Sequence, residues 1–325
     1  MAGSLTGARK GGMTARVLGA ARWDRFTRRL ENFESQLVWI FGSPRSGSTW
    51  LLQLLGDHET VVPINEPLIG WYFGPFMCDL PGIDPRQLDS NNFTLRRVHQ
   101  DKRPSFFAEE FEDVWRPGIA RLMLERFHAH ARRHPPEAGL ESALVVIKEP
   151  NGSQSADVIS RALPHSRFVF LLRDGRDVVD SELAANLQGS WITREFPGSR
   201  GVAPGERLEF VVQSAKKWLW RTEVVEAALA AHPGPKYLIR YEELRSAPEV
   251  HLRQLFDWLE LTVSDDELVA MVERRSFEAL PPEARGPKQF FRAAAPGGWR
   301  ENLSEEEQSA LEEVIGPKLR ALGYD

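Results

Sequence analysis

A glycine-rich stretch near the start of the chain contains the residue types that bind phosphate. It has the sequence GSPRSGSTW over residues 42–50. Its glycines and threonine fit the pattern G-x-x-x-x-G-K-[ST], in which backbone N–H groups hold phosphate oxygens. Ser48 stands where that pattern has its lysine, and the nearest cation is Arg45, inside the loop. ATP hydrolysis is therefore a weak hypothesis, because the missing lysine normally contacts the β- and γ-phosphates.

The segments around this stretch predict how it is presented. LVWIFG (37–42) is a short apolar run that predicts a buried strand, and STWLLQLLGDH (48–58) has apolar residues at helical spacing. A strand, a loop and a helix in this order direct backbone N–H groups and the positive helix end at an anion. Arg45 would then face a group on the far side of the bound phosphate. A guanidinium placed there stabilises the bridging oxygen as the neighbouring group departs.

The rest of the chain alternates short apolar runs with helical patterns. Strands are expected at 61–64, 143–148, 167–172 and 236–240, and helices at 109–133, 153–163, 177–187 and 206–231. This alternation indicates βαβ units. We expect an α/β protein with a P-loop-like three-layer fold, in which helices flank a central, mostly parallel β-sheet. No linker divides residues 36–325, which are predicted to form a single domain.

Composition narrows the function and the location. The 325 residues are 42% hydrophobic, enough for a full core, and the net charge of -5 argues against bulk nucleic-acid binding. A single cysteine, Cys78, excludes intramolecular disulfides and is typical of a reducing cytoplasm. No apolar run reaches the roughly 18 residues of a membrane span. The histidines form no ligand-like cluster, so no metal is predicted.

Residues 1–35 form a separate basic segment. We expect a frayed segment followed by a solvent-exposed helix. The less favoured alternative is an amphipathic helix that lies on an anionic membrane surface.

The loop PRSGSTW resembles the 5′-phosphosulfate loop of sulfotransferases that use 3′-phosphoadenosine 5′-phosphosulfate (PAPS), written P-[KR]-[ST]-G-[ST]-[ST]-x. The resemblance implies PAPS as co-substrate, 3′-phosphoadenosine 5′-phosphate (PAP) as product, and no metal. It also implies that Arg45 assists departure of the sulfuryl group and that the 5′-phosphate is bound by Ser46, Gly47, Ser48 and Thr49. Trp50 resembles a tryptophan that lies against adenine, the alternative being a residue of the helix core.

A second segment, RFVFLLRDGRDVVDS, resembles the family's 3′-phosphate element, which implies that Arg173 and Ser181 bind that phosphate. The residues support this independently. Arg173 follows a predicted parallel strand, where ligands collect in α/β sheets, and Ser181 lies two helical turns further on. Arg176 and Asp177 are predicted to form a solvated turn and a helix-start charge.

Two further segments extend the resemblance towards the C-terminus. RYEELRSAP resembles the family's Y-E-[DE]-L stretch, so Tyr241 is expected to contact adenine or else to pack its ring at a helix start. FFRAAAPGGWRENL resembles the loop that closes over the nucleotide, and Arg292 keeps its place there as a cofactor-binding residue. Ala293 and Ala294 replace the family's Lys-Gly pair, which leaves open how this loop holds the 3′-phosphate.

Proton removal from an acceptor requires a positioned base. Lys148, at the end of the strand 143–148, matches the family's strand-end lysine, which would share the charge of the transferring group; the alternative is a lysine that reaches solvent. Glu66, in NEPLIGW, resembles the [ML]-E-P segment of carbohydrate sulfotransferases and is the favoured base. Glu149 is the rival. Side chains alternate along an extended segment, so Lys148 and Glu149 should not both face the pocket.

The sequence therefore predicts a cytoplasmic, prokaryote-like sulfotransferase. It would move a sulfuryl group from PAPS to a hydroxyl, or less favourably an amine, of a carbohydrate, lipid or small natural product. The irregular segment at about 68–140, rich in aromatic residues at its start, is expected on the acceptor side. The alternatives are a P-loop kinase or nucleotide hydrolase that needs Mg²⁺, and a catalytically silent anion-binding module.

Overall fold

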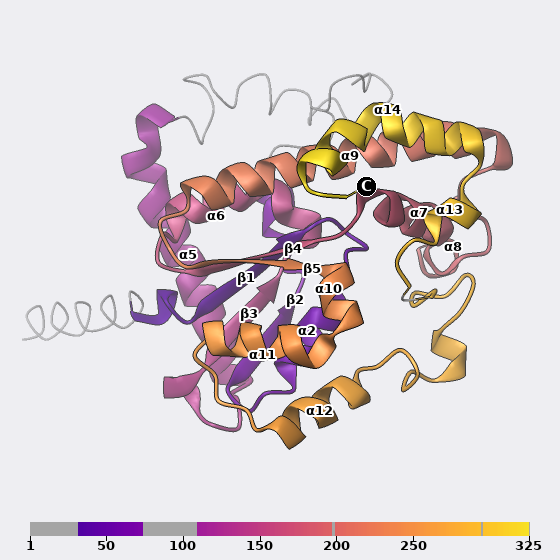
Figure 1. The fold of residues 1–325 in the computed structure, drawn as a ribbon. Coiled ribbons are helices and arrows are strands. Elements are labelled where there is room, and N and C mark those ends of the chain that lie inside the picture. The colour runs from indigo at the N-terminus through magenta and orange to yellow at the C-terminus, as the bar shows by residue number, and fades with distance from the viewer. Residues whose placement is uncertain (1–31, 74–108, 197–198, 294, 325) are drawn as a thin grey trace, which may run out of the picture.

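A computed structural model describes residues 32–73, 109–196, 199–293 and 295–324 (Figure 1). Its sheet has five strands in the order β2-β3-β1-β4-β5, and every neighbouring pair is parallel. The strands are β1 (Leu37–Gly42), β2 (Val61–Asn65), β3 (Leu144–Lys148), β4 (Arg167–Leu172) and β5 (Lys236–Arg240). The predicted parallel sheet is confirmed.

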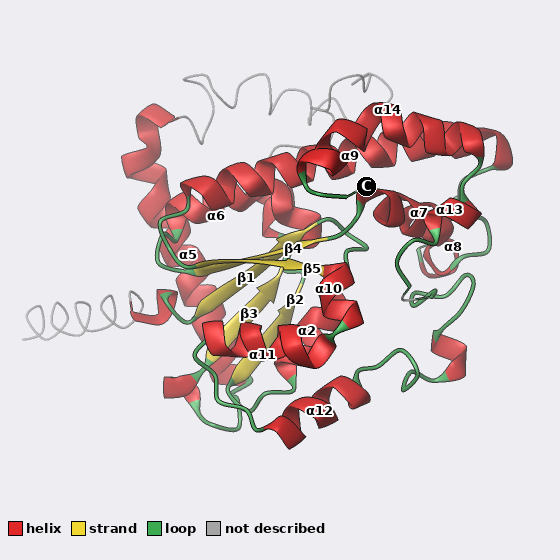
Figure 2. Ribbon diagram, viewed as in Figure 1, coloured by secondary structure: helices red, strands yellow, loops and turns green. Residues whose placement is uncertain are grey.

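Helices cover both faces of the sheet (Figure 2). The α-helices of the described residues are α2 (Ser48–Gly56), α3 (Ile69–Phe73), α5 (Glu112–Arg133), α6 (Ala156–Ala162), α7 (Gly175–Asn186), α8 (Trp191–Glu195), α9 (Arg207–Ala231), α10 (Tyr241–Ser246), α11 (Pro248–Trp258), α12 (Asp265–Arg274), α13 (Trp299–Asn302) and α14 (Glu305–Ala321). Short 3₁₀ helices are η3 (Glu109–Phe111), η4 (Leu140–Ser142), η5 (Pro150–Ser155), η6 (Pro204–Glu206) and η7 (Pro282–Ala284).

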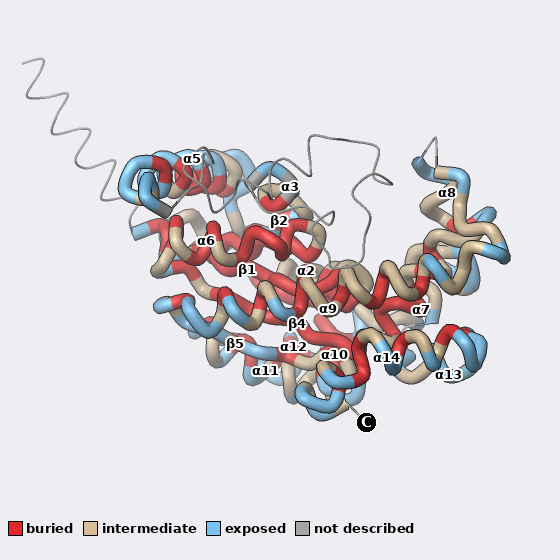
Figure 3. Tube along the Cα trace, turned by 90° about the horizontal axis from the view of Figure 1, so that it is seen from above, coloured by how far each residue is buried: buried red, intermediate tan, exposed pale blue. Residues whose placement is uncertain are grey.

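The two faces of the sheet carry separate hydrophobic cores because side chains alternate along each strand. On β1, Trp39 and Phe41 enter a core shared with α5, α6, α9 and α14, whereas Val38 and Ile40 enter one shared with α2, α11 and α12. Complete burial of a side chain of this size contributes about 2–3 kcal/mol. The buried strands lie in the interior of the molecule (Figure 3), and the two cores, one on each face of the sheet, confirm the predicted three-layer arrangement.

The carboxyl ends of three strands meet at one edge of the sheet. The central strand β1 runs into the glycine-rich loop, β3 ends at Lys148, and Arg173 follows β4 directly. In the sheet, β1 has β2 and β3 on one side and the later strands β4 and β5 on the other, so the direction of strand addition reverses at β1. Ligands bind at such reversals of strand order in α/β sheets. The fold thus brings the chemical groups singled out in the sequence to one edge.

Some elements differ from expectation. The helix predicted over 153–163 begins as the 3₁₀ helix η5 and becomes α-helical only at Ala156. Within the segment predicted to be irregular, residues Ile69–Phe73 form helix α3. Residues 74–108 and most of the basic segment 1–35 lie outside the described residues. Of the helices that are described, none is long and apolar enough to cross a membrane.

Candidate active site

The glycine-rich loop joins β1 to α2 in the predicted way. Gly47 has φ 90° at the N-cap of α2, and Arg45 has φ 68° within the loop. A β-carbon at Gly47 would lie 2.4 Å from the Tyr241 ring. Glycine is therefore required both for its positive φ and for the close approach of the tyrosine. Tyr241, the first residue of α10, packs directly on the loop.

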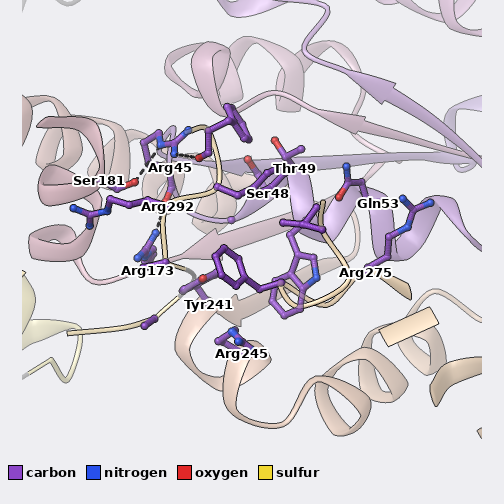
Figure 4. Close-up of a pocket in the computed structure, with 18 residues that line it drawn as sticks. Arg45, Ser48, Thr49, Gln53, Arg173, Ser181, Tyr241, Arg245, Arg275 and Arg292 are labelled. Carbon is purple, nitrogen blue, oxygen red and sulfur yellow. Dashed lines mark hydrogen bonds between the residues drawn. The ribbon is translucent and has the colours of Figure 1, made fainter. Parts of the chain in front are cut away.

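A cavity opens beside this loop (Figure 4). It is lined by most of the residues predicted to bind the cofactor: Arg45, Gly47, Ser48, Thr49, Trp50, Arg173, Ser181, Tyr241 and Arg292. The figure shows Arg45, Arg173, Ser181 and Arg292 gathered on one side of Tyr241. Ser46 does not line the cavity, because its side chain is fully buried beneath the loop.

Arg45 is anchored from two directions. Its Nε donates to Ser181 Oγ (3.2 Å) and its Nη2 donates to the Phe290 carbonyl (2.7 Å). The guanidinium also lies over the Phe290 ring, 4.7 Å from its centroid. Burial, with the positive charge of Arg173 close by, lowers the pKa of Arg45 to about 10, so the group stays charged at neutral pH.

Arg173 links the loop to the aromatic wall of the cavity. Its Nη1 donates to the Arg45 carbonyl (2.7 Å), and its guanidinium lies 4.4 Å from the centroid of the Tyr241 ring. Tyr241 in turn meets Trp50 edge to face at 6.3 Å. Trp50 packs, half-buried, against the core shared with α2, α11 and α12 and also lines the cavity, and its contact with adenine stays a prediction.

Arg45, Arg173 and Arg292 bring three guanidinium groups to one cavity wall. Arg292 forms a bidentate ion pair with the buried Asp180 on α7. Like charges placed this close repel each other, and a bound anion removes that cost. The cavity is therefore complementary to a ligand with more than one negative group.

Asp177 lies in the first turn of α7, as predicted, but neither Arg176 nor Asp177 is solvated. Asp177 is 2% exposed and accepts a hydrogen bond from the Gly297 amide (2.7 Å), and burial raises its pKa. Arg176 pairs with Asp174 (2.8 Å) and lies over the Trp299 ring. Both residues bind the C-terminal loop to α7, a role that local sequence patterns do not reveal.

Glu66 and Lys148 meet at the ends of β2 and β3, next to the loop. Lys148 Nζ lies 2.6 Å from Glu66 Oε1 and donates to Thr49 Oγ1 (2.9 Å). Asn151 Nδ2 donates to Glu66 Oε2 (2.6 Å). A chain of polar contacts thus joins the first turn of α2 to the Glu66 carboxylate, which keeps 26% of its side-chain surface exposed.

Glu149 points away from this group, as the alternation of side chains predicted. It is fully buried, and its carboxylate accepts hydrogen bonds from the amides of Leu68 (3.1 Å) and Gly70 (3.4 Å). Burial raises the pKa of Glu149 to about 7. With both oxygens turned to backbone amides, Glu149 is badly placed to take a proton from an acceptor.

Several residues of the cavity wall were missed by the sequence analysis. Gln53 and Arg245 lie one helical turn after Trp50 and Tyr241, so helical spacing was a usable signal for them. Arg275, Phe277 and Leu280 come from the end of α12 and the loop after it and carry no local signal, whereas Phe290, Phe291, Ala293 and Ala295 belong to the segment FFRAAAPGGWRENL, which was expected to close over the nucleotide. Within the part of the chain that the structure describes, no group of three His, Cys, Asp or Glu residues could hold a metal ion.

Comparison with known proteins agrees with this geometry. The model of the "Sulfotransferase family" matches residues 38–265. A putative protein-tyrosine sulfotransferase of Caenorhabditis briggsae is 24% identical over 304 residues, 91% of each protein. The protein-tyrosine sulfotransferase of Drosophila melanogaster is 22% identical over 90% of this chain, which spans about half (52%) of that relative.

The solved structures show the same architecture. Mouse sulfotransferase SULT7A1, crystallised with PAP, superposes with a TM-score of 0.50 at 12% identity, over 88% of this chain and 85% of that one. The likeness at this identity concerns the fold. The family match covers well over half of the sequence, and on that basis the chain belongs to the sulfotransferase family.

Proposed function

We propose that the protein transfers the sulfuryl group of PAPS to an acceptor hydroxyl, with Glu66 as general base. The observation that carries this proposal is the placement of two anion-binding groups in one cavity. The loop around Arg45 and the pair Arg173 and Ser181 face the same space, as a nucleotide with phosphates at both 5′ and 3′ positions requires.

The cavity wall fits such a nucleotide. The N-terminus of α2, with Ser48 and Thr49, offers amides and hydroxyls to a 5′-phosphate. Arg173, Ser181 and Arg292 supply donors for a 3′-phosphate on the other side of Tyr241. Trp50 and Tyr241 supply ring surfaces for the adenine. Ser46, buried under the loop, would contribute through its position in the loop backbone.

The chemistry follows from the groups beside the loop. The acceptor oxygen bonds to sulfur as the bond between sulfur and the bridging phosphate oxygen breaks, and PAP leaves. Arg45 and Lys148 stabilise the negative charge that develops on the transferring and leaving oxygens. The acceptor proton passes to Glu66, whose carboxylate Lys148 and Asn151 hold in place.

Two classes of acceptor hydroxyl are supported by different observations. Two relatives that align over about 90% of this chain are named protein-tyrosine sulfotransferases, one of them as putative, which favours a phenolic hydroxyl. The Glu-Pro segment at Glu66 resembles carbohydrate sulfotransferases, which favours a sugar hydroxyl. Both classes place a hydroxyl within reach of the same carboxylate.

The test is a transfer assay with ³⁵S-labelled PAPS. The acceptors are a tyrosine-containing acidic peptide, p-nitrophenol, an oligosaccharide and a cell extract. We expect label to move to at least one of them, and Arg45→Ala and Glu66→Gln to lower turnover by about a hundredfold or more. Glu66→Gln should retain wild-type affinity for PAP, and Glu59→Gln, which alters an exposed carboxylate before the start of β2, should leave the rate unchanged.

Full activity in Glu66→Gln would exclude Glu66 as the base without touching the reaction assigned to the protein. Absence of transfer to every acceptor, together with absence of PAP binding, would overturn the reaction itself.

A further inference from the structure

We propose that Glu149 is a positioning residue, whose buried carboxylate holds the loop 66–70 and thereby aims Glu66 at the acceptor. The proposal rests on the function proposed for Glu66. It gives a role to a fully buried acidic side chain that lies beside the reacting groups and touches none of them.

The loop that carries Glu66 has an uncommon backbone. Glu66 has φ 45° and Leu68 has φ 58°, both in the left-handed region that non-glycine residues seldom occupy. This backbone conformation is strained for a residue with a β-carbon and persists only where its surroundings hold it. A loop under this strain needs an external anchor if its carboxylate is to stay in place.

Glu149 supplies that anchor from the end of β3. Its Oε2 accepts from the Leu68 amide (3.1 Å) and its Oε1 from the Gly70 amide (3.4 Å). The Glu66 amide donates to the Lys148 carbonyl (2.9 Å), which fixes the start of the same loop. A carboxylate is suited to this task because both of its oxygens accept hydrogen bonds and neither donates when it is ionised.

The loop 66–70 also packs closely against Glu149 and the 3₁₀ helix η5. A β-carbon at Gly70 would lie 2.0 Å from the Gly152 carbonyl oxygen, and one at Gly152 would lie 2.0 Å from Glu149 Oε1. Two glycines therefore let the loop, the carboxylate and η5 approach each other. The substitution Gly70→Ala would place a methyl group against the backbone of Gly152 and thereby displace the loop from the Glu149 carboxylate.

The experiment is a double-mutant cycle with Glu66→Gln, Glu149→Gln and the combined variant, measured on the best acceptor of the transfer assay. In the glutamine side chain the carbonyl oxygen still accepts, but the NH₂ group that replaces the second carboxylate oxygen only donates, so one loop amide loses its partner. We expect Glu149→Gln to lower kcat by about ten- to a hundredfold while PAP affinity stays within about twofold. In the Glu66→Gln background the same change should have no further effect on kcat, because a positioning residue acts only through the group it positions.

Hydrogen–deuterium exchange of the loop gives a readout that needs no acceptor. Exchange at Leu68 and Gly70 should quicken by about tenfold or more in Glu149→Gln, and also in Gly70→Ala, with no change in the exposed control Glu283→Gln. Gly70→Ala should show the same loss of kcat with PAP affinity kept, so the proposal stays testable if one variant folds poorly.

An unchanged exchange rate at both amides, or a full additional loss of kcat when Glu149→Gln is added to Glu66→Gln, would overturn the proposal. Failure of the proposed function would look different: wild-type protein would neither bind PAP nor transfer sulfate, whatever the loop exchange shows.

Discussion

At the scale of single residues, the serine in the lysine slot of the loop changes which ligand is favoured. Without that lysine, the cations near the loop include Arg45, held by Ser181 and Phe290, and Lys148, held by Thr49 and Glu66. In the proposed reaction, both would stabilise the charge that develops during transfer of a single sulfuryl group. Glu149, one residue after Lys148, is proposed to position Glu66 from within the protein, and its burial has a consequence for stability.

The stability of the protein should fall as the pH rises from about 4.5 to about 7. Burial raises the pKa of Glu149 to about 7 in the folded protein, from the ordinary 4.5 of a solvated glutamate. The unfolded chain releases this proton at lower pH than the folded protein does, so ionisation favours unfolding across that window. A difference of this size corresponds to about 3 kcal/mol between the two ends. Chemical denaturation at a series of pH values measures it.

Glu149→Gln has no proton to lose, so its unfolding free energy should lack this part of the pH dependence. Glu283→Gln is the matched control and should follow the wild type. The same slope in Glu149→Gln and in wild-type protein would show that Glu149 ionises with an ordinary pKa.

At the scale of elements, the sequence predicted what local patterns determine. Continuous apolar runs identified β1, β4 and β5 with their observed bounds, and β2 and β3 to within one residue. The loop between β1 and α2 was predicted because its glycines and hydroxyls are adjacent in sequence. Such signals are sufficient when a structure depends on neighbours along the chain.

Contacts between distant elements carried no such signal. Asp180 and Arg292 are 112 positions apart, and Arg45 meets the Phe290 carbonyl across 245 positions. Asp177 was taken for a solvated charge because a helix start next to arginine usually is one. Its burial depends on a loop that returns from the C-terminus, which the sequence around it does not reveal.

The ion pair between α7 and the C-terminal loop should be far more important than a surface pair. Asp180 is 2% exposed and accepts from Arg292 and from Asn302 Nδ2 (3.0 Å). In Arg292→Ala this buried carboxylate keeps only the hydrogen bond from the Asn302 side chain. Breaking a buried ion pair costs about 3–5 kcal/mol. Because Arg292 is itself 24% exposed, we expect a loss of about 2–3 kcal/mol in unfolding free energy, with weaker PAP binding.

Adding Asp180→Asn to Arg292→Ala should restore part of both quantities, because it removes the unpaired charge. Arg200→Ala, which breaks an exposed pair with Glu206, is the control and should change stability by less than about 1 kcal/mol. A double variant that is less stable than Arg292→Ala would contradict this account.

At the scale of the whole molecule, the net charge of -5 and the arginine-lined cavity have opposite signs. We therefore expect the arginines that line the cavity to attract an anionic nucleotide, although the protein as a whole is negatively charged. The cluster joins the loop after β1, the end of β4, α7 and the C-terminal loop. A ligand that contacts all of these should stabilise the fold as a unit.

PAP should raise the melting temperature more than AMP or ATP with Mg²⁺ at equal concentrations. At a hundred times its Kd, a ligand that binds only the folded protein stabilises it by about 2.7 kcal/mol, which in a chain of this size raises Tm by about 4 °C. AMP lacks the 3′-phosphate that Arg173 and Ser181 would contact, and ATP lacks the loop lysine for its γ-phosphate. The shift caused by PAP should shrink with added salt, because the attraction is electrostatic. In Arg173→Ala the advantage of PAP over AMP should largely disappear. Stabilisation by ATP with Mg²⁺ but not by PAP would instead point to phosphoryl transfer, and the cavity would then hold its nucleotide without the 3′-phosphate contacts.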